Sequence, residues 1–185
     1  MRLAATAQSD MTERERLARD LAAACYLSGT FTLRSGAESS FYFDKYQFAA
    51  DPALLRRVVR ELALLIPEGT QVLAGLELGA VPIATALSLE TGIPAAFVRK
   101  KAKEYGTRRL SEGAEIRSKH VCVVEDVITT GGQVAASTGE LRALGAVVTS
   151  VVCVFWRGTG EPALPGGLTC RSLFDARDLA PFAPQ

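Results

Sequence analysis

The sequence of 185 residues has little of what several common kinds of functional site require. Its one histidine, His120, excludes H-E-x-x-H metalloprotease sites and zinc sites built from several histidines. It also leaves a single candidate partner for a serine or cysteine nucleophile. No C-x-x-C pair exists, which excludes zinc ribbons and thioredoxin-like motifs, and reduced thiols are expected. The four cysteines are widely spread: Cys25, Cys122, Cys153 and Cys170.

An excess of one charge and long apolar runs are also missing. Lys and Arg total 21 and Asp and Glu total 20, so the formal net charge of +1 argues against non-specific nucleic-acid binding as the main role. No stretch approaches the roughly 20 apolar residues of a membrane span. The polar N-terminus also lacks the apolar segment of a signal peptide. We therefore expect a cytoplasmic protein that binds neither nucleic acid nor membranes.

The composition itself is typical of one globular domain. Hydrophobic residues make up 48% and charged residues 22% of the chain, both near globular averages. A chain of this size buries about 70% of its unfolded surface. Because no repeat or linker divides it, we expect residues 1–185 to form a single domain.

Apolar runs and helical patterns alternate along most of the chain. Helices are expected after the Thr12–Glu15 capping box, where the apolar face runs on until Gly29, and after Asp51-Pro52. Two more are expected over about 81–90 and 132–144, and strands over 71–74, 95–98, 120–124, 147–155 and, at the sheet edge, 168–174. Apolar strands separated by helices indicate βαβ units and a parallel sheet covered on both faces.

Two regions depart from this rhythm. Short strands over 31–33 and 41–43, joined by a Ser35-Gly36 turn, predict a small hairpin or hood within about 12–45. Residues 99–119 are polar and show little apolar periodicity, and a long polar loop in a compact domain is usually functional. Within them, 99–109 hold six Lys or Arg and one Glu, so the neutral total conceals a concentrated cationic segment.

The most informative stretch is 121–132, where an apolar strand ends in Glu125 and Asp126. A Thr-Thr-Gly-Gly turn follows and a helix starts at once. Such a turn lets backbone amides and a helix N-terminus bind a phosphate, and ligands of α/β sheets bind at this end of the strands. Two carboxylates beside it suit hydroxyls or a hydrated divalent cation. Because Walker A and G-x-G-x-x-G motifs are absent, a sugar phosphate is the expected ligand.

This segment resembles the 5-phosphoribosyl 1-pyrophosphate (PRPP) signature of type I phosphoribosyltransferases. The resemblance implies their α/β fold, a mostly parallel twisted sheet flanked by helices, with a small N-terminal hood and a long mobile catalytic loop. It implies that Glu125 and Asp126 contact the ribose hydroxyls and that the turn wraps the 5′-phosphate. The implied turn residues are Val127, Ile128, Thr129, Thr130, Gly131, Gly132 and Gln133.

Two further segments are similar to orotate phosphoribosyltransferases. The run RKKAKEYGTRRLSEG at 99–113 resembles their catalytic loop, and FTLRSG at 31–36 with the aromatic-rich 41–44 resembles their hood. The resemblance covers roughly 14–157. It implies transfer of ribose 5-phosphate from PRPP to orotate, giving orotidine 5′-monophosphate and pyrophosphate in de novo pyrimidine biosynthesis. It also implies Mg²⁺ as cofactor and a homodimer in which the loop reaches the neighbouring active site.

The same resemblance assigns roles to side chains. Lys103 would neutralise the leaving pyrophosphate, and the other loop residues that bind PRPP and assist catalysis are Arg99, Lys100 and Tyr105. The residues implied to hold orotate are Arg34, Tyr42, Phe43, Thr129 and Arg157. No metal ligand is assigned, because Mg²⁺ would be held mainly by PRPP and water.

Departures from the family pattern leave alternatives open. Gly79 stands where some members carry Lys, and Tyr105 where many carry His. Trp156 replaces the Asp that usually precedes Arg157, and it either stacks on a base or shields the sheet end. A phosphoribosyltransferase for another base therefore stays open, although Arg34 and Arg157 suit a carboxylate-bearing base. A PRPP-sensing regulator is disfavoured because the N-terminus is too short for a helix-turn-helix.

Overall fold

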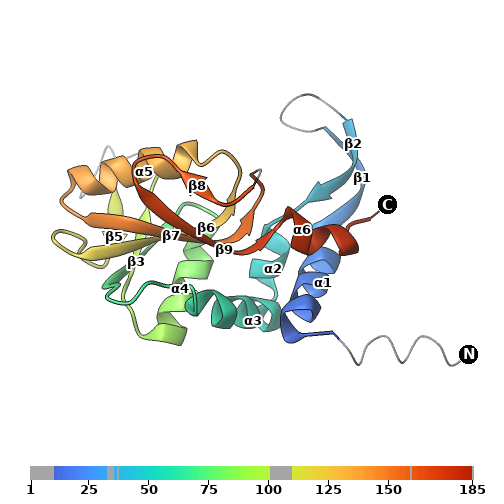
Figure 1. Ribbon diagram of the computed structural model, residues 1–185, viewed down its shortest axis with the longest axis horizontal. Helices are drawn as coiled ribbons and strands as arrows, with labels where there is room; N and C mark the ends of the chain where they lie inside the picture. The colour runs from blue at the N-terminus through green and yellow to red at the C-terminus, as the bar shows by residue number, and fades with distance from the viewer. Residues whose placement is uncertain (1–10, 33–35, 37, 101–109, 159, 185) are drawn as a thin grey trace, which may run out of the picture.

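The computed structural model of the protein describes residues 11–32, 36, 38–100, 110–158 and 160–184. These residues form two sheets. The smaller one is the antiparallel hairpin of β1 (Tyr26–Thr32) and β2 (Glu38–Phe43), which stands apart from the large sheet (Figure 1). It is the predicted hood, and both of its strands begin earlier in the chain than the apolar residues alone indicate.

The large sheet has seven strands in the order β5-β4-β3-β6-β7-β9-β8. Five of them run parallel, and β5 and β8 pair antiparallel at the two edges. The strands are β3 (Val72–Leu76), β4 (Ala95–Val98), β5 (Ser111–Gly113), β6 (His120–Ile128), β7 (Val147–Trp156), β8 (Ala163–Leu164) and β9 (Leu168–Asp175). The expected parallel sheet is confirmed.

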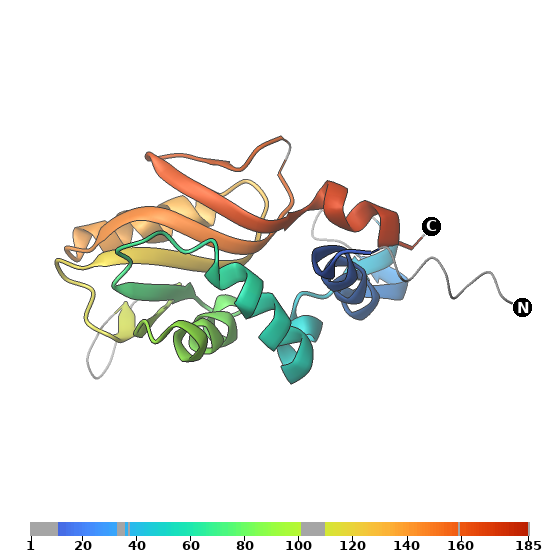
Figure 2. The same cartoon turned by 60° about the horizontal axis from the view of Figure 1, so that its bottom comes forward.

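Helices cover both faces of this sheet. Figures 1 and 2 show α3 and α4 on one face and α5 on the other. The helices are α1 (Glu13–Cys25), α2 (Tyr46–Ala50), α3 (Pro52–Ala63), α4 (Ala80–Thr91), α5 (Gly132–Ala143) and α6 (Ala176–Leu179), and the 3₁₀ turn η1 (Ala180–Phe182) follows. None of the helices in the described ranges is long and apolar enough to cross a membrane.

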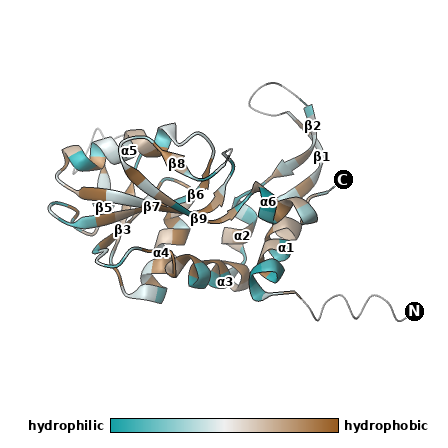
Figure 3. Ribbon diagram, in the orientation of Figure 1, coloured by the Kyte–Doolittle hydropathy of each residue, from teal (hydrophilic) through white to brown (hydrophobic). Residues whose placement is uncertain are grey.

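The core consists of two apolar layers that share the central strands. Cys122 and Val124 of β6 belong to the layer beneath α3 and α4, whereas Val121 and Val123 belong to the layer beneath α5. This is the alternation of a strand buried on both faces, and the inner strands are accordingly the most hydrophobic part of the ribbon (Figure 3). Burial raises the pKa of the Cys122 thiol to about 11, as expected for a core cysteine.

The predicted helix starts are confirmed. Thr12 and Glu15 form a reciprocal capping box at α1. The side chain of Asp51 accepts hydrogen bonds from the first turn of α3, where Pro52 occupies the first helical position. The expected end of the first helix was wrong, because the backbone pairs as β1 from Tyr26 onwards and Gly29 lies inside that strand.

Three further expectations about strands were wrong. The strand expected over 120–124 continues to Ile128 because its backbone keeps pairing with β7, so Glu125 and Asp126 lie within it. Part of the expected 99–119 loop forms β5, since pairing with β4 at a sheet edge requires no apolar alternation. The strand β9 lies inside the sheet rather than at its edge, because β8, in the glycine- and proline-containing segment before it, pairs along its outer side.

Candidate active site

The topology of the large sheet indicates a ligand site at the carboxyl ends of β3 and β6. The chain passes from β3 through α4 to β4 on one side, and from β6 through α5 to β7 on the other. The strand order therefore reverses between β3 and β6, and open α/β sheets bind ligands at such a switch point. His120 begins β6 and so lies at the opposite end of that strand from the acid pair.

A cavity of about 450 Å³ opens at this point and is called the turn cavity here. Its lining combines the turn after β3, the end of β6, the first turn of α5 and side chains from outside the sheet. The lining residues are Lys45, Tyr46, Glu77, Leu78, Lys100, Glu125, Val127, Ile128, Thr129, Thr130, Gly131, Gly132, Gln133 and Val134.

The N-terminus of α5 is built to bind an anion. Gly131 precedes the helix at φ 73° and has no side chain to cap the first turn. Gly132, Gln133 and Val134 of that turn line the turn cavity, so backbone amides that lack a partner within the helix lie at this cavity. A Cβ atom at Gly131 would overlap with the side chain of Leu164. Both the positive φ and the close contact therefore require glycine at this position.

The two acids of β6 differ in their surroundings. Glu125 lines the turn cavity, whereas Asp126 is buried beneath it and pairs with Lys45, whose Nζ lies 2.8 Å from Oδ2 and 3.1 Å from Oδ1. Burial raises the pKa of Glu125 well above its usual range, and the hydrogen bond and negative charge of Asp126 raise it further. These causes disfavour ionisation of Glu125, while Asp126 stays paired with the Lys45 ammonium.

A second cavity of about 460 Å³ lies between the hood and the sheet and is called the aromatic cavity here. Phe43 of the hood packs against the sheet, because its ring stacks on that of Phe155 in β7 with 5.3 Å between the ring centroids. Aromatic faces beside cationic groups suit a flat anionic ring. The cavity is lined by Tyr26, Phe41, Tyr42, Phe43, Lys45, Val127, Thr129 and Arg157.

The two cavities adjoin. Lys45, Val127 and Thr129 line both, so a ligand in one lies beside a ligand in the other. This arrangement suits a group transfer between an anionic sugar phosphate and a flat ring, because both reactants are held next to each other.

The structure brings most of the predicted site residues together. Four of the five residues expected to hold orotate line the aromatic cavity, and Lys100, Glu125 and the whole 127–133 turn line the turn cavity. Asp126 lies beneath them. Arg99 lines neither cavity; its backbone amide donates to Leu110 at 2.9 Å. The remaining three, Arg34, Lys103 and Tyr105, lie outside the described residues.

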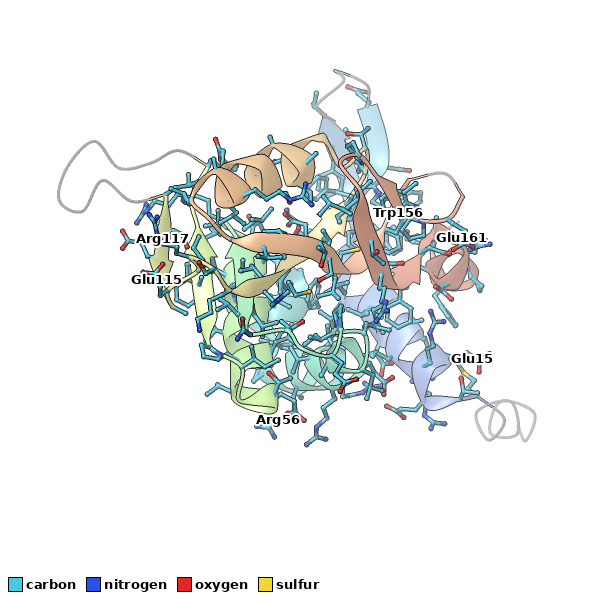
Figure 4. All side chains as sticks on the ribbon, turned by 60° about the vertical axis from the view of Figure 1, so that its left-hand side comes forward. Glu15, Arg56, Glu115, Arg117, Trp156 and Glu161 are labelled. Carbon is cyan, nitrogen blue, oxygen red and sulfur yellow. The ribbon has the colours of Figure 1, made fainter. Side chains whose placement is uncertain are left out.

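Trp156 does not line either of these cavities. Its buried indole Nε1 donates to the carbonyl of Gly160 at 3.1 Å, and the ring packs so closely on Gly158 that a Cβ atom there would overlap it. Figure 4 shows Trp156 and, farther out on the loop that follows, Glu161. These contacts support the interpretation that Trp156 shields the sheet end and holds this loop.

Sequence reasoning missed Lys45, Tyr26 and Phe41. Tyr26 belongs to a hood strand that was predicted too short, whereas Phe41 lies within the predicted strand 41–43 and was given no role there. Lys45 follows the aromatic-rich run and precedes α2, and it meets Asp126 across 81 positions of sequence. The one available signal was a lysine two residues after the aromatic hood strand.

Comparisons with known proteins agree with this geometry. Residues 48–165 match the family model of the phosphoribosyl transferase domain. The chain is 53% identical over 171 residues to an orotate phosphoribosyltransferase of a Nocardioides species, covering 91% of this chain and 96% of that protein.

Two crystal structures of the Mycobacterium tuberculosis H37Rv orotate phosphoribosyltransferase share the fold. The complex with Fe(III) dicitrate aligns with a TM-score of 0.81 at 34% identity, and the complex with PRPP with a TM-score of 0.77 at 30% identity. Each alignment covers 91% of this chain and 99% of the other. The chain belongs to the orotate phosphoribosyltransferase family, and its members are enzymes of the pentosyltransferase class.

Proposed function

We propose that the protein transfers the ribosyl 5-phosphate group of PRPP to orotate and that its two cavities divide the substrates. The observation that carries this proposal is the junction of the turn cavity and the aromatic cavity at Lys45, Val127 and Thr129. Holding C1′ of PRPP and N1 of orotate beside each other there removes much of the entropic barrier of a two-substrate reaction.

PRPP occupies the turn cavity in this proposal. The free amides at the start of α5, with the hydroxyls of Thr129 and Thr130, bind the 5′-phosphate. Glu125 and Asp126 accept hydrogen bonds from the ribose hydroxyls. Lys100 lies at the same cavity and faces the pyrophosphate, and the family resemblance adds the side chains of Arg99, Lys103 and Tyr105.

Orotate occupies the aromatic cavity. Tyr42 and Phe43 pack on its ring, and Thr129 offers a hydroxyl at the junction. Arg157 is fixed for binding the carboxylate because its backbone amide donates to Ile128 at 2.8 Å, which places it directly after the sheet. Arg34 is the second cation proposed for this carboxylate.

The reaction replaces the C1′–O bond of PRPP with a C1′–N1 bond and releases the N1 proton of orotate. N1 of orotate attacks C1′ of the ribose, the bond from C1′ to the pyrophosphate oxygen breaks, and its electron pair leaves with pyrophosphate. The N1 proton goes to solvent, and no strong base is needed because the ring N–H of orotate is acidic. Positive charge develops on the ribose and negative charge on the leaving group, so catalysis consists mainly of positioning and electrostatic stabilisation.

Mg²⁺ fits the oxygen donors of this site. Carboxylates such as those of Glu125 and Asp126 are the ligands Mg²⁺ prefers. In the described part of the chain no cluster of three or more His, Cys, Asp or Glu could hold a metal. We therefore propose that PRPP oxygens and water supply most of the Mg²⁺ ligands, with Glu125 and Asp126 nearest among the side chains. When bound, the ion neutralises negative charge on the pyrophosphate.

The family resemblance extends the proposal to assembly and cellular role. We propose a homodimer whose 99–109 segment reaches the neighbouring active site and closes it against water, in a cytoplasmic enzyme of de novo pyrimidine biosynthesis. Mixing a subunit inactivated at Lys103 with one inactivated at Arg157 tests the assembly. Partial recovery of activity in the mixture supports sharing of the site between subunits. A mixture that stays as inactive as the two variants alone contradicts it.

The activity is tested with purified protein, PRPP, Mg²⁺ and orotate by following the ultraviolet absorbance of orotate. Loss of orotate that depends on PRPP is expected. Consumption of a different base in its place would overturn the assignment to orotate. Binding of PRPP with no base consumed would favour the regulator.

A further inference from the structure

Lys45 is a cation at the centre of the site to which no role has been given above. It lines both the turn cavity and the aromatic cavity, and its Nζ lies 2.8 Å from Oδ2 of Asp126. The side chain of Lys45 is 37% exposed, whereas that of Asp126 is 2% exposed. Lys45 therefore has a buried anion on one side and open cavity on the other.

The backbone on both sides of Lys45 is fixed. The carboxylate of Asp44 accepts hydrogen bonds from the Tyr46 amide at 3.0 Å and from Gln47 Nε2 at 2.8 Å. The Asp44 amide donates to the carbonyl of Cys25 at 2.8 Å. The junction of the hood and α2 thus sets the position from which the lysine reaches the sheet.

The ammonium group lies next to Gly79, in the turn after the carboxyl end of β3. Gly79 follows β3, and a Cβ atom at this position would overlap with the Asp126 carboxylate and lie 3.4 Å from Lys45 Nζ. The turn of residues 77–79 offers backbone and the acidic Glu77 to the cavity but no cation. Lys45 supplies positive charge here from a distant part of the chain.

The charge of the turn cavity requires such a group. Among the described lining residues the cations are Lys45 and Lys100, and they face Glu77 and Glu125 with Asp126 beneath. A pyrophosphate group with several negative charges next to these acids needs neutralisation. Burial opposes the charged form of Lys45, but the hydrogen bond and charge of Asp126 outweigh it and leave the pKa of Lys45 above its usual value. The ion pair with Asp126 therefore favours the charged form of Lys45.

We infer that Lys45 is a PRPP-binding residue whose ammonium group contacts the pyrophosphate while Asp126 holds it in place above Gly79. This inference rests on the proposed function, since it assigns the ligand of the turn cavity. Asp126 then has two roles, because it orients Lys45 and it lies beside the ribose hydroxyls.

The test compares Lys45→Met, which keeps the length of the side chain and removes the charge, with Lys45→Arg, which keeps the charge. Calorimetry without orotate measures PRPP affinity with no turnover. Loss of a charge-assisted hydrogen bond predicts about 10- to 100-fold weaker PRPP binding in Lys45→Met. Lys45→Arg should recover most of the PRPP affinity.

Affinity for orotidine 5′-monophosphate, which shares the 5′-phosphate but lacks pyrophosphate, should change less than about threefold in Lys45→Met. Lys119→Met, an exposed lysine before β6, is the matched control and should bind PRPP like the wild type.

Lys45→Met leaves Asp126 without its cation and could fail to fold, so the Asp126→Asn background provides a second comparison. Because the buried charge is already absent there, adding Lys45→Met should still weaken PRPP binding. Equal affinities of the single and double variants would mean that Lys45 only neutralises Asp126, and this would overturn the inference.

Other outcomes separate this inference from the proposed function. A wild-type protein that binds no PRPP would overturn both. Wild-type binding with unchanged affinity in folded Lys45→Met would overturn the inference alone. Equal losses of PRPP and orotidine 5′-monophosphate affinity would contradict the contact with pyrophosphate.

Discussion

The turn cavity and the aromatic cavity have similar volumes but are built in different ways. The turn cavity is largely one continuous segment, 125–134, fixed by the pairing of β6 and by the start of α5. The aromatic cavity joins the hood to the end of the sheet, and side chains such as Phe43 and Arg157 supply its surface. Backbone groups therefore dominate the turn cavity, and side chains dominate the aromatic cavity.

The difference predicts different sensitivity to substitution. A backbone anion site fails when its conformation is disturbed, whatever the new side chain offers. A cavity built from side chains can lose one contact and keep its shape, because each residue contributes a separable part of the binding energy.

The largest effect on activity is expected from Lys103→Ala, which concerns the binding of PRPP in the turn cavity. If Lys103 neutralises the departing pyrophosphate, its removal should lower kcat by about 10²–10⁴, the range seen for single groups that stabilise developing charge. Orotate affinity measured at equilibrium should barely change. An unchanged kcat would remove Lys103 from the mechanism.

Gly131→Ala tests the backbone site directly. The new Cβ would overlap with Leu164 and would force an alanine to adopt φ 73°. We expect a loss of about 100-fold or more in kcat/KM for PRPP and about 1–3 kcal/mol of stability. The matched control is Gly139→Ala within α5, where a Cβ meets nothing within 4 Å. That change should leave activity intact and stabilise the helix by about 0.5–1 kcal/mol. Similar results for both glycines would contradict the special role of Gly131.

Arg157→Ala tests the side-chain cavity. Removing a charge-assisted contact with a carboxylate should raise KM for orotate about 10- to 100-fold, with PRPP affinity unchanged. Arg56→Ala, an exposed arginine of α3 on the outside of the molecule (Figure 4), is the control for charge alone. An effect confined to PRPP would assign Arg157 to the other cavity.

The contrast between the cavities also explains how much of the site could be predicted from the sequence. The 125–133 segment is recognisable because strand, acids, turn and helix are contiguous, and local geometry alone brings them together. Capping and turn chemistry likewise located the starts of α1 and α3. These features depend on neighbours in sequence.

What could not be predicted depends on pairing between distant segments. The ion pair of Lys45 with Asp126, the edge strand β5 and the inner position of β9 all result from such pairing. Two-residue β8 carries no periodic pattern, yet it covers the outer side of β9. Hydrophobic periodicity reports burial along one segment and does not report which segment lies beside it.

The smallest effect expected is a pH dependence of stability caused by Glu125. Its folded-state pKa is raised by burial and then by Asp126, so above about pH 4.5 the folded protein keeps a proton that the unfolded chain releases. The stability contributed by this proton is fully present below the unfolded pKa and is lost as the pH rises toward the folded pKa. Between pH 5 and 8 the free energy of unfolding should therefore fall by up to about 1.4 kcal/mol per pH unit from this group.

Glu125→Gln isolates that contribution because an amide keeps a donor and an acceptor and does not titrate. Urea unfolding at pH 5, 6, 7 and 8 should show the variant gaining on the wild type as the pH rises, by a total of about 1–3 kcal/mol. Glu140→Gln, on the exposed side of α5, should follow the wild-type curve. Parallel curves for Glu125→Gln and the wild type would mean that the acid pair is already fully ionised in the folded protein. The turn cavity would then lack the neutral acid, and Lys45 would face two negative charges rather than one.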